Sequence, residues 1–143
     1  MEKEMKRAII LDNYENPFKK GLKNDKSYMK VNGNNESCID NLDFEIKIED
    51  NIIVDMNFNG EACAISTSSA SIMIKLLLNK TIKEALNIIN NFENMIDEKT
   101  YNEEILKEAN CYDEIYKQPA RKKCALLPFV TIKRKIIEEY YEN

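Results

Sequence analysis

The chain has 143 residues, of which 43% are hydrophobic and 32% charged, and this composition is ordinary for a single globular domain over residues 1–143. It contains no histidine, so any metal site must use sulfur and oxygen ligands, which excludes most metalloenzyme classes. The formal net charge of −4 gives no general attraction to nucleic acid or to an anionic membrane, and neither is expected as a partner.

The amino-terminal sequence does not predict a signal peptide. Residues 1–10 are charged and lack an apolar stretch followed by a small-residue cleavage site. The longest apolar runs, such as residues 76–78, are too short to span a bilayer. A cytoplasmic location is therefore expected, and in that compartment the four cysteines are more typical of metal binding or catalysis than of structural disulfides.

The first third of the chain predicts one helix followed by a polar connection. Apolar residues within 2–14 follow a helical period, and Asn16-Pro17 is expected to end that helix. A short strand is expected at residues 28–31, and Gly33-Asn34 is typical of a turn.

An antiparallel hairpin is the clearest local prediction. Apolar and charged residues alternate with period two from Leu42 to Ile48, and apolar residues alternate again from Ile52 to Phe58. Asp50-Asn51 supplies a turn between the two strands, and Gly60 is expected to end the second one.

The rest of the chain predicts helices. Residues 66–71 are small and hydroxyl-bearing, which suits the first turn of a helix whose apolar face begins at Ile72. Thr81 and Glu84 have the spacing of a capping box, which predicts a second helix through Ile89.

The carboxyl-terminal third is harder to divide. Residues 93–114 are expected to be helical in pieces, with a break at Pro119. A last helix is expected over about 124–140, because Pro128 is tolerated only in a first turn. The order of elements predicts an α+β fold, with helices packed on one face of a small antiparallel sheet.

Two neighbouring segments carry opposite charge. Residues 93–114 are mainly acidic, whereas the charged side chains of residues 117–135 are all basic and surround Cys124. Two interpretations stay open: two solvated faces of opposite sign, or a basic patch that stabilises a thiolate or docks a partner.

Three cysteines and one aspartate are the strongest indication of function. Cys38 and Asp40 precede the first strong strand, Cys63 lies between the hairpin and a helix, and Cys124 is expected at the start of the last helix. Side chains at element ends can converge on one sheet edge, and helix amino termini lower a thiol pKa. Three thiolates and a carboxylate can bind zinc or iron. From spacing alone, separately buried cysteines remain an alternative.

The residues around these four positions resemble the SufU branch of the IscU/NifU-type iron–sulfur assembly family. The resemblance is carried, in order, by the segments at residues 13–21, 38–40, 60–71 and 119–124. IscU proteins have a histidine before the last cysteine, where this chain has Lys123. The interval between the last two matching cysteines also includes an acidic segment like the insertion of SufU proteins.

The resemblance implies a SufU/IscU-like α+β fold in which Cys38, Asp40, Cys63 and Cys124 hold one Zn²⁺. It implies that Cys38 accepts persulfide sulfur from a SufS-like cysteine desulfurase and passes it to downstream iron–sulfur assembly or recipient proteins. The chain would then be a sulfurtransferase or scaffold rather than a conventional enzyme. Two alternatives stay open: a scaffold that assembles a [2Fe–2S] cluster, or binds iron, on the same ligands, and a structural zinc module that mediates protein interactions.

Several residues near the four ligand positions are candidates for supporting roles. Arg121 matches a family arginine and would contact the desulfurase or steady the thiolates, and Lys123 would favour the Cys124 thiolate. Ile39 and Ala62 stand where the family has glycine. Because a β-branched residue adopts positive φ only with strain, the Cys38 loop is expected to differ in shape.

Two further residues, Glu36 and Cys111, lie outside the expected ligand set. Glu36 stands where the family usually has proline, in the same loop as Cys38. Cys111 lies in the acidic segment, matches no ligand of the family, and is expected to be incidental to the site.

Overall fold

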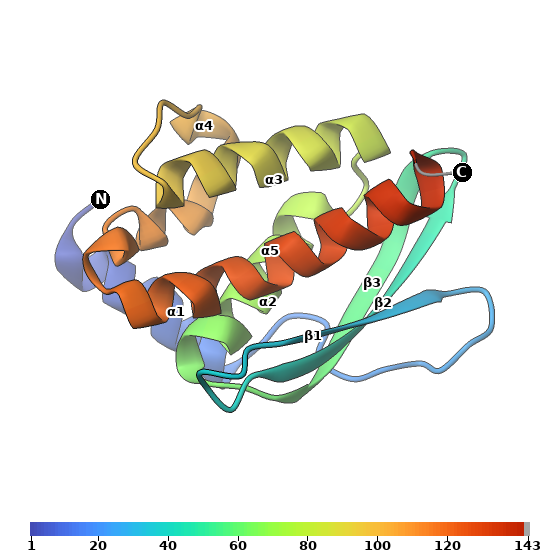
Figure 1. The fold of residues 1–143 in the computed structure, drawn as a ribbon, viewed down its shortest axis with the longest axis horizontal. Coiled ribbons are helices and arrows are strands. Elements are labelled where there is room, and N and C mark those ends of the chain that lie inside the picture. The colour runs from blue at the N-terminus through green and yellow to red at the C-terminus, as the bar shows by residue number, and fades with distance from the viewer. Residues whose placement is uncertain (142–143) are drawn as a thin grey trace.

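A computed structural model describes residues 1–141 of the chain (Figure 1). The elements are, in chain order, α1 (Lys3–Glu15), β1 (Met29–Asn34), β2 (Asn41–Glu49), β3 (Ile52–Glu61), α2 (Ala64–Leu77), α3 (Ile82–Ile96), α4 (Glu103–Leu106), η1 (Lys107–Tyr112), η2 (Ile115–Lys117) and α5 (Pro119–Tyr140). This order confirms the predicted α+β class.

The strands form one antiparallel sheet in the order β1-β2-β3. Asp50 and Asn51 connect β2 to β3 with positive φ values of 51° and 61°, and Glu49 pairs with Ile52 across the turn. Positive φ at both central residues is the geometry of a type I′ turn, which matches the twist of the flanking strands. The predicted hairpin is confirmed.

The start of β3 differs from the predicted alternation. The register with β2 shifts between Lys47 and Ile48, so β3 contains one extra residue there. As a result Ile53 is buried, whereas Ile52 and Val54 are exposed. A bulge moves every residue beyond it to the opposite face of the sheet. The prediction assumed an uninterrupted alternation, so it placed Ile52 and Val54 on the buried face.

The predicted turn at Gly33-Asn34 is wrong, because both residues belong to β1. Gly33 pairs with Leu42 of β2, and it faces α5. A Cβ atom at this glycine would lie 2.2 Å from Thr131 Oγ1, so only glycine admits the helix this close to the strand. A long-range packing requirement therefore accounts for this glycine.

The helices cover one face of the sheet, as predicted. In Figure 1, α2 and α5 lie between the sheet and α3, and the beginnings of α2 and α5 lie at the same end of the molecule as α1. The core between these layers includes Phe92 stacked on Phe129, with ring centroids 3.8 Å apart. The capping box at Thr81 and Glu84 begins α3 as expected.

The opposite face of the sheet is covered by the connection between α1 and β1. Glu45 is fully buried there, and its carboxylate accepts hydrogen bonds from the backbone amides of Lys23 and Asn24 at 2.9 and 3.1 Å. Asn57 donates a third bond to the same carboxylate at 2.8 Å. A buried charge needs this degree of hydrogen bonding to be tolerated, so Glu45 ties the connection to the sheet.

The last helix begins earlier than predicted. It starts with Pro119, which suits a first helical position, and Pro128 lies in its interior. An interior proline has no N–H to donate to the carbonyl four residues earlier, which here is the carbonyl of Cys124. The Ser66 hydroxyl lies 3.0 Å from that carbonyl, where it can take the place of the missing donor. Local sequence rules could not foresee a donor supplied from another helix.

The acidic segment, residues 93–114, is helical in pieces, as expected: it contains the last turn of α3, then α4 and η1. Among the residues that the structure describes, no helix combines the length and the apolar character needed to cross a membrane.

Candidate metal centre

The four predicted ligands come together at the end of the molecule where α2 begins. The ligand atoms of Cys38, Asp40, Cys63 and Cys124 all lie within 4.8 Å of one another. They come from the loop before β2, from the residue that precedes β2, from the cap of α2 and from α5. Residues far apart in sequence therefore form one cluster of three thiols and one carboxylate.

Asp40 is the most firmly held of the four. Its side chain is only 1% exposed, its Oδ1 accepts a bond from the Cys63 amide at 2.9 Å, and its Oδ2 accepts one from the Ser66 hydroxyl at 2.5 Å. Burial raises the pKa of Asp40, but the hydrogen bonds from Ser66 and Cys63 outweigh it and hold that pKa below its ordinary value. The site therefore contains a fixed carboxylate.

Cys63 occupies the predicted position at the start of a helix. It is the N-cap of α2, and its Sγ accepts a hydrogen bond from the Ser66 amide at 3.5 Å. This sulfur therefore lies at the positive end of the helix dipole, beside the other three candidate ligand atoms.

Cys124 does not lie at a helix start. It is in the second turn of α5 and is 4% exposed, and its thiol lies 3.8 Å from the Ala120 carbonyl. Burial, together with the nearby Asp40 and Cys63, raises the pKa of the Cys124 thiol. The expectation that a helix terminus lowers this pKa is wrong, because α5 begins at Pro119.

Ser66 is a site residue that sequence reasoning missed. Its hydroxyl lies 2.5 Å from Asp40 Oδ2, 3.0 Å from the Cys124 carbonyl oxygen and 3.7 Å from Cys63 Sγ. A hydroxyl donates one proton, so the two oxygens compete for it. The available signal was Pro128, four residues after Cys124, because it removes the helical donor to that carbonyl.

The other serines of α2 are also buried and form hydrogen bonds with other elements, whereas their sequence indicated only the first turn of a helix. Ser68 bonds the Tyr112 hydroxyl, Ser69 donates to the Ala125 carbonyl at 2.6 Å, and Ser71 donates to the Asn13 side chain at 2.8 Å. Small hydroxyl side chains let the neighbouring helices approach α2 closely while satisfying their polar groups.

The loop that carries Cys38 is organised by Asn35, which sequence reasoning also missed. The Asn35 carbonyl accepts from the Cys38 amide at 3.0 Å, its side-chain oxygen accepts from the Ser37 amide at 3.1 Å, and its backbone amide donates to the Asp40 carbonyl at 3.0 Å. Its side-chain amide lies 3.6 Å from Cys124 Sγ. An asparagine at the start of a tight turn is a recognisable signal for such a role.

The replacement of two family glycines does not strain the backbone. Neither Ile39 nor Ala62 has positive φ, so the strain considered for the Cys38 loop is absent. Instead Ile39 extends its side chain outward and is 68% exposed. Positive φ occurs at Gly60, where a Cβ would lie 2.2 Å from the Asn41 carbonyl oxygen.

The two basic residues that were expected to support the site lie near the centre without bonding to it. Arg121 is exposed on the first turn of α5, where it lines a neighbouring cleft, and Lys123 is also exposed. Within residues 1–141, neither side chain hydrogen-bonds any of the four clustered residues. Cys111 is buried in η1 outside the cluster, and burial raises its pKa.

The donor set fits a tetrahedral ion. Zinc bonded to thiolates at about 2.3 Å places neighbouring ligand atoms just under about 4 Å apart. The four ligand atoms already lie within 4.8 Å of one another, so modest side-chain movement suffices. Thiolate ligands also suit an iron–sulfur cluster. A thiol-rich centre at the end of this α+β fold is an arrangement that can hold a metal ion or cluster.

Comparison with known proteins identifies the family. Residues 5–125 match the NifU-like N-terminal domain. The chain is 35% identical to the zinc-dependent sulfurtransferase SufU of Bacillus subtilis, over 93% of this chain and 90% of that protein. It is 34% identical to the iron–sulfur cluster assembly scaffold protein IscU of Thermotoga maritima, over 92% of each chain. The chain therefore belongs to the NifU-like N-terminal family of iron–sulfur cluster assembly proteins.

A solved structure supports the same conclusion about the fold. The chain superposes with a TM-score of 0.79 on a protein of Fervidobacterium islandicum AW-1, described as an iron–sulfur cluster assembly scaffold for the SUF system. The identity is 32%, and the superposition covers 88% of this chain and 92% of that one. The resemblance read from the sequence motifs and the expected SufU/IscU-like fold are both confirmed.

Proposed function

We propose that this protein binds one Zn²⁺ through Cys38, Asp40, Cys63 and Cys124 and accepts sulfur on Cys38 during iron–sulfur cluster assembly. The donor would be a cysteine desulfurase, and the acceptors would be downstream assembly or recipient proteins. The relative from B. subtilis, which bears the name zinc-dependent sulfurtransferase, supports this choice. Bound zinc would supply a charge that keeps the thiolates deprotonated without redox chemistry of its own.

The observation that carries the proposal is the unequal exposure of the ligands. Asp40 and Cys124 are almost fully buried, whereas Cys38 is partly exposed on a loop whose tip, Ile39, projects outward. A partner can therefore approach Cys38 while the buried ligands stay in place. A nucleophilic sulfur must be both activated and reachable. Cys63 is partly exposed as well, but it caps α2, whereas Cys38 lies on a loop beside the exposed Ile39.

The chemistry is a thiol exchange that needs no oxidant or reductant. The Cys38 thiolate attacks the terminal sulfur of a persulfide on the desulfurase, and a new S–S bond forms at Cys38. The S–S bond of the donor breaks, and its cysteine leaves as a thiolate. The same exchange in the next step passes the terminal sulfur from Cys38 to a downstream thiol.

The remaining site residues would hold the geometry during this exchange. Ser66 and the Cys63 amide fix the Asp40 carboxylate, and Asn35 connects the Cys38 loop to Cys124. These bonds do not depend on the thiol of Cys38 itself. They leave the fixed ligands in position when that thiol turns toward a partner.

The test measures sulfur uptake by intact mass. The zinc-loaded chain is incubated with the desulfurase of the same organism and with cysteine, and Cys38→Ser is compared with Cys111→Ser. We expect the wild type and Cys111→Ser to gain sulfur and Cys38→Ser to gain none. Uptake by Cys38→Ser contradicts the assignment. Purification of a brown, iron- and sulfide-containing chain supports the scaffold alternative, and a zinc-bound chain that neither takes up sulfur nor accelerates the desulfurase supports a structural module.

A further inference from the structure

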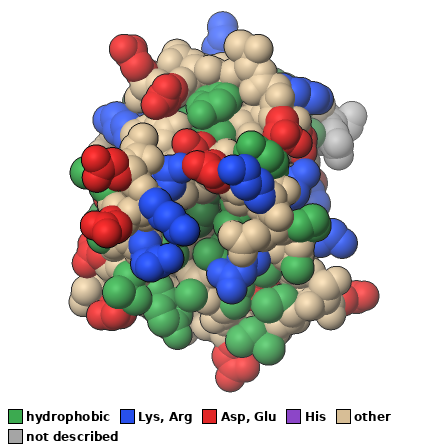
Figure 2. All heavy atoms as spheres, turned by 90° about the vertical axis from the view of Figure 1, so that its left-hand side faces the viewer, with side chains coloured by type: hydrophobic (Ala, Val, Ile, Leu, Met, Phe, Trp, Pro, Cys, Tyr) green, Lys and Arg blue, Asp and Glu red, His purple; other side chains and the backbone are tan. Residues whose placement is uncertain are grey.

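A basic cleft lies beside the metal centre, between α1, η2 and the start of α5. Figure 2 shows Lys and Arg side chains gathered around a hollow with hydrophobic side chains inside it. The cleft has a volume of about 440 Å³. Its cationic side chains are Lys3, Lys6, Arg7, Lys117 and Arg121, and its apolar ones include Ile10, Ile65 and Ile115. Ile65, which lines the cleft, follows the candidate ligand Cys63 by two residues, so the cleft lies next to the metal centre.

Three of these cations have no counter-charge in the folded chain. Lys6 pairs with Asp113 and Glu114, and Lys117 also pairs with Glu114. By contrast, three others form no ion pair with any residue in the range 1–141; these are Lys3, Arg7 and Arg121. Unpaired charges of one sign around a concave surface attract an anionic partner.

A second, shallower hollow lies on the side of the centre that carries the Cys38 loop. Its lining includes Tyr14, Ile39, Ala62 and Thr67, together with the charged residues Lys20 and Glu61. Tyr14 and Ile39 are 45% and 68% exposed. Exposed aromatic and aliphatic side chains beside polar surroundings are typical of the centre of a protein interface.

One face of α1 joins the two hollows. Lys3, Arg7, Ile10 and Tyr14 are spaced by four, three and four residues, so they lie on one side of the helix. The first three line the basic cleft, and Tyr14 lines the second hollow. We call these four residues the α1 stripe. It forms a continuous surface with cations at one end and apolar groups at the other.

We infer that the α1 stripe and Arg121 dock the sulfur-donating desulfurase, with acidic side chains of that partner in the basic cleft and an apolar group against Tyr14 and Ile39. The inference rests on the function proposed above. A donor must bring its persulfide into contact with Cys38, and a stable interface covers roughly 800 Å² on each partner. Such an area around Cys38 reaches both hollows, so the partner must match their charge and polarity.

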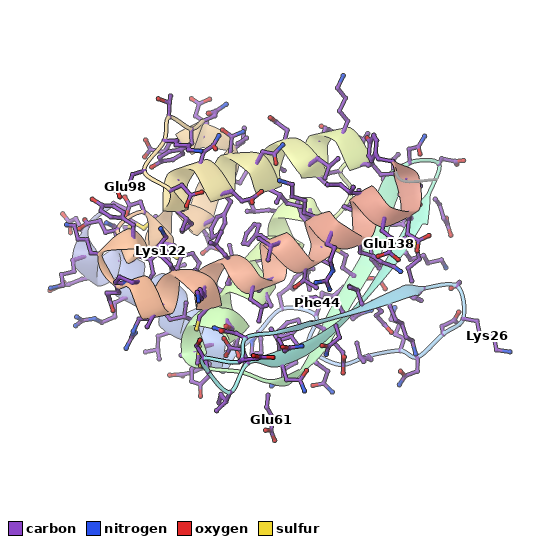
Figure 3. All side chains as sticks on the ribbon, viewed as in Figure 1. Lys26, Phe44, Glu61, Glu98, Lys122 and Glu138 are labelled. Atoms are coloured by element: carbon purple, nitrogen blue, oxygen red, sulfur yellow. The ribbon has the colours of Figure 1, made fainter. Side chains whose placement is uncertain are left out.

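The test compares charge reversals of equal size at two places. Lys3→Glu/Arg7→Glu reverses the stripe, and Lys26→Glu/Lys83→Glu makes the same change of net charge elsewhere. Lys26 and Lys83 are exposed, and Figure 3 shows Lys26 at the tip of the loop farthest from α1. Binding of the zinc-loaded variants to the desulfurase is measured at low and high salt. Zinc content and thermal unfolding confirm that each variant is folded.

We expect the stripe reversal to weaken binding by at least about tenfold at low salt and by less at high salt, because screening reduces interactions between exposed charges. The control should change binding less than about twofold. Ile39→Ser should weaken binding by a factor that salt does not alter, since its contribution is apolar. Equal losses in the stripe and control variants, or none in either, would overturn the inference.

Two further results separate a desulfurase-docking surface from a self-association surface and from a failure of the proposed function. If the chain alone forms a dimer that the stripe reversal dissociates, the surface serves a second copy and the inference is overturned. If the wild type takes no sulfur from the desulfurase at any concentration, the proposed function fails and the docking inference fails with it. If uptake occurs with the same concentration dependence in wild type and stripe variant, only the docking inference is wrong.

Discussion

The two sides of the metal centre are built differently. On one side Asp40 and Cys124 are buried against α2, where Ser66 faces both of them. On the other side Cys38 lies in a loop that is organised by a single asparagine and ends in an exposed isoleucine. The fixed side can retain an ion, and the exposed side can present a sulfur to a partner.

The difference follows from which parts of the fold supply each side. The fixed side uses Asp40, directly before β2, and Cys124, in the interior of α5, and both residues are buried. Cys63, at the start of α2, is partly exposed, as Cys38 is. The exposed side uses a turn whose bonds are local, apart from the contact of Asn35 with Cys124 at 3.6 Å. Local bonds of exposed loops open more readily than packed elements do.

Removing Asp40 should have the largest effect, because it breaks the fixed side. Asp40→Ala removes a proposed ligand and leaves the Cys63 amide unpaired in a partly buried position. We expect zinc affinity to fall by more than about 100-fold, which is more than the loss of a hydrogen bond to a ligand usually causes. The metal-free chain should lose about 1–3 kcal/mol of stability. Competition titration and denaturant unfolding measure the two effects, and Asp43→Ala, at an exposed position of the central strand β2, is the control.

A double-mutant cycle tests whether Ser66 compensates for Pro128. Ser66→Ala should cost about 1–3 kcal/mol, because it removes the hydroxyl that the Asp40 carboxylate and the Cys124 carbonyl share. Pro128→Ala restores a helical N–H to that carbonyl, so in this background the same change should cost about 1 kcal/mol less. Ser69→Ala, which affects the adjacent carbonyl, should cost the same in both backgrounds. Equal costs for Ser66→Ala in the two backgrounds would contradict the compensation.

Alkaline pH should destabilise the metal-free chain through its buried thiols. Burial raises the folded-state pKa of Cys111 and Cys124 above the ordinary value of 9.0. A raised folded pKa gives stability that is complete below the unfolded pKa and is lost as pH rises above it. Each thiol should therefore cost up to about 1.4 kcal/mol per pH unit above roughly pH 9.

Urea midpoints at a series of pH values measure this loss. The free energy of unfolding should fall less steeply with alkaline pH in Cys111→Ala, because one of the two buried thiols is gone. Cys124→Ser should reduce the slope by a similar amount. An alkaline fall that neither substitution reduces would show that other groups cause it. Asp40 has the opposite sign, because its lowered pKa gives stability that is lost only as the pH falls through its folded pKa.

The smallest effect is expected at the tip of the exposed side. Ile39 has negative φ and is largely exposed, so Ile39→Gly relieves no strain and removes little packing. We expect a loss of about 0.5 kcal/mol or less, from the greater freedom of the unfolded glycine chain. Thermal unfolding measures it. A clear gain in stability would show that the isoleucine backbone is strained after all.

Local patterns predicted much of this fold. The capping box at Thr81 and the turn at Asp50-Asn51 are local signals, and both elements form where the sequence places them. The four residues that the fold brings together were also selected from the sequence, because the motifs around them are specific to a family. The β3 bulge and the strand position of Gly33 were not predicted, since a register shift and a close helix contact depend on residues far away in sequence.

The roles of Ser66 and Asn35 show the same limit within the site. Ser66 meets the Cys124 carbonyl across 58 residues, and Asn35 meets Cys124 Sγ across 89 residues. Neither residue bears a group that marks it as a ligand. Their importance arises from what the fold places beside them.

The sequence by itself determined the donor chemistry, because the absence of histidine and the motifs around the cysteines leave sulfur and one carboxylate as ligands. It also determined the α+β class through hydrophobic periodicity. Only the tertiary structure decided which of the four candidate ligands are buried and which are partly exposed. Burial and hydrogen bonding at Asp40 and Cys124 depend on helices that meet from distant parts of the chain, and such contacts have no local pattern.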